Sequence, residues 1–215
     1  MLKCIIFDFD GVIADSEPVH RAVEKKALED VGIIVTDDDI IPFAGLPNRD
    51  FFTAAVKKFG KTQNYDIDKI IENKIEMLSS LLGNIVLIDG VDEFIEKAYE
   101  KYSLAIATSS RKKLVKYVLN AFELEPFFRH IAAIDDVKRG KPFPDLYLKA
   151  SELMGFKPEE CIAIEDSTNG LISAQSAGMR CAMIDDGSQD TSNADFVFKD
   201  FKKLRLDDLE KFYMK

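Results

Sequence analysis

Two carboxylates near the N-terminus have the type and spacing that phosphoryl transfer requires. Asp8 and Asp10 end a short apolar run, and Gly11 follows them directly. Side chains alternate along a strand, so the two carboxylates share one side and lie about 7 Å apart along the chain. One could attack phosphorus while the other serves the leaving oxygen on the far side. Taken alone, an Asp-x-Asp-Gly sequence fits a solvated turn equally well.

Groups suited to bind phosphate follow two later apolar runs. Thr108, Ser109 and Ser110 stand where one run gives way to a helical pattern, so hydroxyls and backbone amides there could cradle phosphate oxygens. Ser110 could instead cap that helix. Lys141 lies in a loop stiffened by two prolines, where a fixed ammonium could neutralise phosphate or a charged nucleophile. A lone lysine in a loop is more commonly a solvated charge.

Adjacent carboxylates end a further apolar run. Glu165 and Asp166 offer oxygen ligands without a nearby His or Cys, and such sets favour a hard cation such as Mg²⁺. A cation is also needed because Asp8, Asp10 and Asp166 would otherwise repel a phosphate dianion. The pattern therefore predicts a Mg²⁺ cofactor. The alternative is a polar pair that caps the following helix.

The elements that must position these groups alternate along the chain. Short β-prone runs occupy residues 3–9, 103–107, 131–134, 161–164, 181–184 and, more weakly, 196–198. Stretches of helical period separate most of them, at 91–102, 114–122, 146–154 and 170–177. Uninterrupted apolar strands alternating with helices predict an α/β fold, a Rossmann-like open parallel sheet covered by helices on both faces. Ligands bind at the C-terminal strand ends of such sheets.

Residues 16–82 break this alternation. They contain helical patterns at 19–31, 50–59 and 67–82 and no convincing strand run. An all-helical cap domain, inserted after the first strand at residues 16–82, is the simplest interpretation. The α/β core is then discontinuous, with residues 1–15 and 83–215.

Composition limits the class of partner. A formal net charge of -9 disfavours nucleic acid, and no apolar run approaches the roughly 20 residues that span a bilayer. The short N-terminal apolar run leads into carboxylates where a signal peptide would have small residues. Cys4, Cys161 and Cys181 lie far apart inside apolar runs, as buried thiols do. We therefore expect a cytoplasmic protein that contacts neither nucleic acid nor membrane.

Together these motifs resemble the haloacid dehalogenase (HAD) superfamily, in subclass I, which has a helical cap after the first strand. The resemblance covers nearly the whole chain and rests on DFDGV at 8–12, Thr108, GKPFPD at 140–145 and EDSTNG at 165–170.

The resemblance implies roles for the motif residues. It makes Asp8 the nucleophile that forms an aspartyl phosphate and Asp10 the acid/base residue. Thr108 and the Ser109 amide would hold the phosphoryl group, and Lys141 would balance its charge. Metal ligands would be the Asp8 carboxylate, the Asp10 backbone carbonyl, Glu165 and Asp166, directly or through water. The family's dehalogenases lack the second aspartate, so Asp10 argues against dehalogenation.

Substrate choice in this subclass lies mainly in the cap. His20, Arg49 and Lys74 resemble polar cap residues of β-phosphoglucomutases, and Gly45 lies in the same loop as Arg49. The mutase loop usually reads Lys-Gly-x-Ser-Arg, whereas residues 44–49 read AGLPNR, which lacks the lysine and has one residue more. Each of these side chains could also be an ordinary helix-surface or hinge residue.

We therefore expect a monomeric phosphatase of a small phosphorylated metabolite, a sugar phosphate. A β-phosphoglucomutase-like phosphomutase is the alternative, in which the phosphoenzyme passes its phosphate to a sugar hydroxyl. A noncatalytic binding protein on the same fold is a third hypothesis, but it would have no need of Asp10.

Overall fold

A computed structural model describes the chain except for residues 44–45, 62–63, 186, 188–189 and 215. The chain divides into two compact units, which we call the core and the cap. The core comprises residues 1–15 and 86–215, and the cap comprises residues 16–85.

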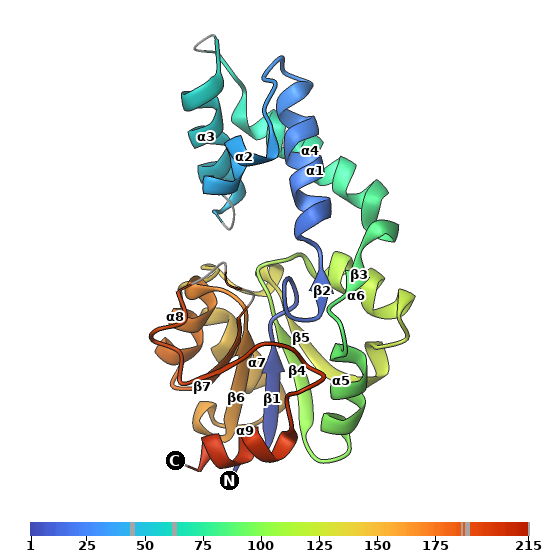
Figure 1. The fold of residues 1–215 in the computed structure, drawn as a ribbon, viewed down its shortest axis with the longest axis vertical. Helices are drawn as coiled ribbons and strands as arrows, with labels where there is room; N and C mark the ends of the chain where they lie inside the picture. Colours follow the sequence, from blue (N-terminus) through green and yellow to red (C-terminus); the bar gives the residue numbers. More distant parts are fainter. Residues whose placement is uncertain (44–45, 62–63, 186, 188–189, 215) are drawn as a thin grey trace. The chain divides into compact units, whose positions relative to one another are not determined.

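The core is built on one six-stranded parallel sheet (Figure 1). Its strands follow the order β5-β4-β1-β6-β7-β8. They are β1 (Cys4–Phe7), β4 (Ser103–Ala107), β5 (Phe128–Ala132), β6 (Cys161–Glu165), β7 (Arg180–Ile184) and β8 (Phe196–Phe198). The predicted open parallel sheet is therefore confirmed. β1 lies centrally between β4 and β6, and all four of its residues are buried.

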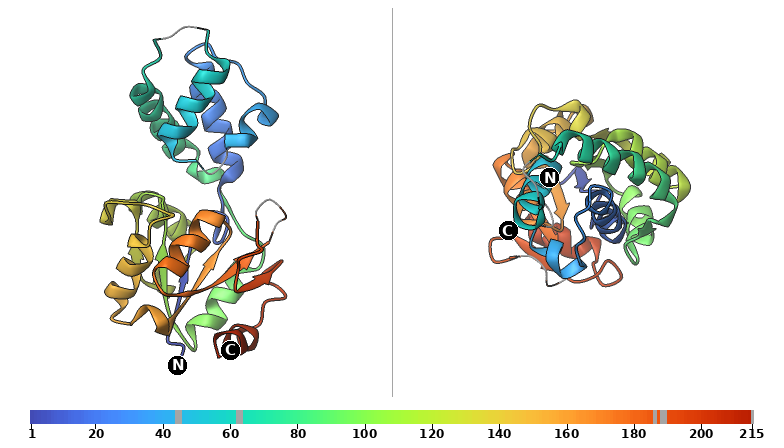
Figure 2. Two further views of the ribbon diagram at one scale, coloured as in Figure 1. Left: turned by 90° about the vertical axis from the view of Figure 1, so that its left-hand side faces the viewer. Right: turned by 90° about the horizontal axis from the view of Figure 1, so that it is seen from above.

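Helices cover both faces of the sheet because alternate strand residues serve opposite layers (Figure 2). Cys4 and Ile6 of β1 pack in a cluster with residues of α7 and α8. Phe7 points the other way and meets Phe94 of α5 edge-on, with 6.2 Å between ring centroids. The core helices are α5 (Val91–Tyr99), α6 (Lys112–Ala121), α7 (Asp145–Met154), α8 (Thr168–Ser176) and α9 (Leu206–Tyr213).

The regular elements among the described residues of the cap are all helices, and the cap has its own apolar centre. Its α-helices are α1 (Glu17–Glu29), α2 (Asp37–Ile40), α3 (Asn48–Phe59) and α4 (Ile67–Leu81). Leu28 of α1, Phe52 of α3 and Ile70 of α4 are buried together in one cluster. Thr36 begins α2 with a capping box, in which its hydroxyl and the Asp39 carboxylate satisfy backbone amides at the helix start. No described helix is long and apolar enough to cross a bilayer.

Several elements differ from the sequence predictions. β5 begins at Phe128 rather than Ile131, because exposed Arg129 and half-buried His130 interrupt the apolar pattern of this edge strand. The chain segments on either side of the cap pair as short antiparallel strands, β2 (Ala14–Asp15) and β3 (Val86–Leu87). Two residues carry no periodicity, so the sequence gives no signal for such a pair. α9 was not predicted either.

Candidate active site

Asp8 lies at the C-terminal end of the central strand. Its amide donates to the Ile164 carbonyl of β6 at 2.9 Å, so the parallel pairing continues one residue past β1. The chain then turns at Gly11, which has a φ of 75°. A Cβ on Gly11 would lie 2.0 Å from the Asp166 Oδ2 atom. Glycine is therefore required here both for the turn and for the close approach of Asp166.

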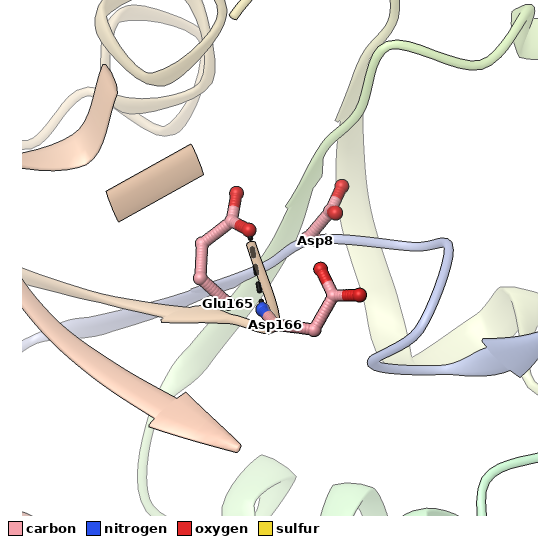
Figure 3. A group of neighbouring side chains, drawn as sticks. All are labelled: Asp8, Glu165 and Asp166. Carbon is pink, nitrogen blue, oxygen red and sulfur yellow. Dashed lines mark hydrogen bonds between the residues drawn. The ribbon is translucent and has the colours of Figure 1, made fainter. Parts of the chain in front are cut away.

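Three carboxylates converge at these strand ends. One oxygen from each of Asp8, Glu165 and Asp166 lies within 4.8 Å of the others (Figure 3). Burial, opposed by Lys141, raises the pKa of Asp8 well above its ordinary value, and neighbouring carboxylates raise it further. Burial and the Glu165 charge raise the pKa of Asp166 to about 8. Burial is the main cause in both cases, so the charged forms of these carboxyls are disfavoured unless further positive charge lies beside them.

Lys141 is the cation that faces this cluster. Its Nζ lies 2.7 Å from Asp8 Oδ1 and 2.5 Å from Glu165 Oε1, and its side chain is only 6% exposed. Burial alone would lower the pKa of Lys141, but the Asp8 and Glu165 charges outweigh it and raise that pKa. Lys141 is therefore a buried ammonium bound to the predicted nucleophile, and the solvated-lysine alternative is wrong.

Glu165 is completely buried, and both of its carboxylate oxygens accept hydrogen bonds. Oε1 accepts from Lys141 and from the Tyr147 hydroxyl, the latter at 2.7 Å. Oε2 accepts from the Asp166 amide and from the amide and hydroxyl of Ser167, at 3.2 to 3.4 Å. Ser167 also begins α8, where its hydroxyl accepts from the Gly170 amide. Capping of α8 is thus done by Ser167, which frees the preceding carboxylates for the site.

Asp10 is held by a different partner from Asp8. The Ser110 hydroxyl donates to Asp10 Oδ2 at 2.6 Å. α6 begins after Arg111, so Ser110 does not cap it. The Thr108 side chain is fully buried, and its Oγ1 accepts from the Ser110 amide at 2.9 Å. Ser110, in the loop after β4, is therefore hydrogen-bonded both to Thr108 and to Asp10.

Sequence reasoning missed Tyr147 and the role of Ser110. Tyr147 reads as one more apolar residue of the helical pattern at 146–154, and it is fully buried. Burial and the Glu165 charge raise the pKa of Tyr147 well above its ordinary value, so its hydroxyl remains a donor. The position of Ser110 before a helical pattern suggests a helix cap, and nothing in the sequence indicates its hydrogen bond to Asp10.

In the cap, the structure brings two of the predicted substrate-binding residues together. Lys74 is 3% exposed, and its Nζ lies 3.1 Å from His20 Nδ1 and 3.0 Å from Asn48 Oδ1. Glu24 faces the same ammonium at 3.5 Å. Lys74 is therefore buried and paired, and the alternative of an ordinary lysine exposed on a helix surface is wrong.

The two predictions in the adjoining loop have different outcomes. Arg49 is exposed in the first turn of α3 and forms an ion pair with Asp68 of α4. Gly45 lies outside the described residues.

The donor set at the strand ends fits a hard divalent cation. Three carboxylates supply oxygen ligands at mutual distances that one ion could span, and oxygen ligands are those that such a cation prefers. The residues present are thus able to hold a metal ion.

Comparison with known families agrees with this geometry. The profile of a family described as haloacid dehalogenase-like hydrolase matches residues 5–184. This chain belongs to the haloacid dehalogenase-like hydrolases. The match includes every strand-end residue discussed above, and it confirms both the resemblance drawn from the motifs and the prediction of an HAD-like phosphohydrolase.

Individual relatives of this HAD chain include sugar phosphatases. The phosphorylated carbohydrates phosphatase of Thermotoga maritima is 30% identical over 181 residues, which cover 83% of this chain and 82% of that protein. The fructose-1-phosphate phosphatase YqaB of Escherichia coli is 28% identical over 175 residues, covering 81% and 92%. A β-phosphoglucomutase structure from Clostridium difficile superimposes with a TM-score of 0.84 at 23% identity, over 100% of this chain and 98% of that one. The last comparison shows a shared fold.

Proposed function

We propose that this HAD hydrolase is a Mg²⁺-dependent phosphatase of small phosphorylated metabolites, in particular sugar monophosphates, and that it acts through an aspartyl phosphate on Asp8. The observation that carries the proposal is the buried Asp8 carboxylate, which is bound by Lys141 at 2.7 Å beside the carboxylates of Glu165 and Asp166. Relatives that act on phosphorylated carbohydrates support the substrate class.

The first step transfers the phosphoryl group to the protein. An Asp8 oxygen attacks phosphorus, and the bond from phosphorus to the sugar oxygen breaks. Asp10 donates its proton to that departing oxygen, so the sugar leaves as a neutral alcohol. Thr108 and the Ser109 amide are proposed to hold the phosphoryl oxygens, while Lys141 offsets their charge.

The second step restores the protein. Asp10, now a carboxylate, takes a proton from water, and the water oxygen attacks phosphorus. The acyl phosphate bond then breaks, which releases inorganic phosphate and regenerates the Asp8 carboxylate. Asp8, Asp166, the Asp10 backbone carbonyl and Glu165 are the proposed holders of Mg²⁺, which when bound would neutralise charge on the phosphoryl oxygens.

Charge pairing inside the cap supports a phosphatase over a mutase. A mutase must hold a second phosphate, and His20, Arg49 and Lys74 are the cap residues proposed for substrate recognition, with Gly45 in the same loop. Glu24 offsets the charge of Lys74, and Asp68 offsets that of Arg49. A carboxylate beside each cation lowers the positive potential that would attract a second phosphate dianion.

The test is release of inorganic phosphate from a panel of sugar monophosphates with and without Mg²⁺. We expect turnover that requires the ion and is abolished in Asp8→Asn. If β-glucose 1-phosphate were instead converted to glucose 6-phosphate in a bisphosphate-dependent manner without net phosphate release, the protein would be a mutase. If neither reaction occurred, the noncatalytic alternative would replace the proposal.

A further inference from the structure

Tyr147 is a buried polar residue for which the reaction assigns no part. It lies in the first turn of α7, two residues after Asp145, and its side chain is fully enclosed. A hydroxyl in such a place costs stability unless it is hydrogen-bonded, and a phenylalanine would fill nearly the same volume without that cost. We therefore expect the Tyr147 hydroxyl to have a functional role in the site.

Two contacts connect Tyr147 to the reacting groups. The hydroxyl donates to Glu165 Oε1 at 2.7 Å, the same oxygen that Lys141 contacts at 2.5 Å. The ring contributes separately, because the Lys141 ammonium lies 5.3 Å from its centroid. This is within the range of a cation–π interaction, which strengthens away from water.

These contacts form a chain that ends at the nucleophile. The Tyr147 hydroxyl donates a hydrogen bond to Glu165 Oε1, and that oxygen contacts the Lys141 ammonium. Lys141 Nζ in turn lies 2.7 Å from Asp8 Oδ1. Without the hydroxyl, the Glu165 carboxylate could rotate and draw Lys141 away from Asp8. The hydroxyl donates to Glu165 rather than to Asp8, so its hydrogen bond reaches the nucleophile through Glu165 and Lys141.

We propose that Tyr147 is a positioning residue that keeps the Lys141 ammonium in contact with the Asp8 carboxylate. Its hydroxyl fixes the orientation of the Glu165 carboxylate through a hydrogen bond, and its ring contacts Lys141 through a cation–π interaction. The proposal rests on the phosphatase function above for its kinetic consequences. It adds a residue from α7 to a site otherwise built from strand ends and the segments that follow them.

Tyr147→Phe tests the hydroxyl while keeping the ring. We expect kcat to fall about ten-fold, the effect of one hydrogen bond to a charged group, with KM changed less than about two-fold. In a Glu165→Gln background the same substitution should change kcat less than about two-fold, because its route to Lys141 is already broken. An equal loss in both backgrounds, or an unchanged kcat in Tyr147→Phe, would overturn the proposal.

Tyr102→Phe is the matched control. Its hydroxyl also donates to a carboxylate, that of Glu210 at 2.5 Å, and Tyr102 is 7% exposed. This variant should lose stability without a change in kcat. A comparable loss of kcat in the control would mean that the Tyr147 effect is only structural.

A second readout separates this inference from the phosphatase proposal. If the wild-type chain released no phosphate from any substrate, the proposed function would fail. The positioning role could then still be tested by hydrogen exchange of the Lys141 ammonium. Exchange of its protons with water, followed by NMR, should quicken in Tyr147→Phe as the ammonium loosens. Unchanged exchange would contradict the proposal.

Discussion

Gly170 gives the sharpest test of how the site is packed, because it lies against the Glu165 carboxylate. A Cβ at this position would be 1.9 Å from Glu165 Cδ and 2.0 Å from each of its oxygens. Gly170→Ala must therefore displace the carboxylate from Lys141 or from Ser167. Glu165 is fully buried, so it has no solvent to move into.

The expected magnitude follows from opposing effects. Loss of one hydrogen bond to a charged group costs about 1.5–3 kcal/mol. Overpacking in a filled interior costs a further ~1–3 kcal/mol. Gly170 is in α8, where alanine is favoured over glycine by up to about 1 kcal/mol. The net expectation is a loss of roughly 2–4 kcal/mol in the free energy of unfolding.

Urea unfolding and phosphate release would measure the two consequences of Gly170→Ala. We expect the stability loss above and a fall in kcat of at least about ten-fold, since displaced Glu165 no longer fixes Lys141. Gly83→Ala is the control, because Gly83 is exposed and a Cβ there meets nothing within 4 Å. Its stability should change by less than about 0.5 kcal/mol. If Gly170→Ala were as stable as wild type or more so, with full activity, the packing argument would be refuted.

Three further predictions concern other contacts. Ser110→Ala removes the donor to Asp10 and should lower kcat ~10-fold with little change in KM, whereas Ser110→Thr should retain most activity in steady-state assays. Glu24→Gln leaves the Lys74 charge buried without its carboxylate and should cost about 3 kcal/mol in urea unfolding, and adding Lys74→Met should restore stability. Burial tends to raise the pKa of Asp136, but a backbone amide and an ammonium outweigh it and hold that pKa below its ordinary value. The resulting stability is present above about pH 4 and is lost as pH falls through the lowered value, so Asp136→Asn should flatten the acid-unfolding curve.

The grouping of the core carboxylates was predictable because these residues stand at the ends of apolar runs. In a parallel sheet, strand ends meet at one edge, so Asp8 and Asp166 could be placed together without knowledge of the side-chain geometry. The alternation of strand and helix patterns likewise predicted the parallel sheet. Both predictions rest on local patterns, which recur each time the chain passes from a strand to a helix.

Other features were beyond prediction because they depend on which long-range partner a residue finds. The Tyr147 hydroxyl meets Glu165 across 18 positions of sequence, and Ser110 meets Asp10 across 100. Lys74 could have been a surface lysine by residue type, yet it is buried and its ammonium contacts His20 and Glu24 of α1. Neither hydrophobic periodicity nor residue type predicts which distant residues will form hydrogen bonds with each other.

The most direct test of the central claim is to identify the residue that carries phosphate during turnover. A reaction with a sugar monophosphate and Mg²⁺ would be quenched in acid, digested and analysed by mass spectrometry. The account predicts a phosphorylated peptide containing Asp8, whose phosphate is removed by hydroxylamine, and no such peptide from Asp8→Asn. Phosphate on another residue, or turnover undiminished in Asp8→Asn, would contradict it.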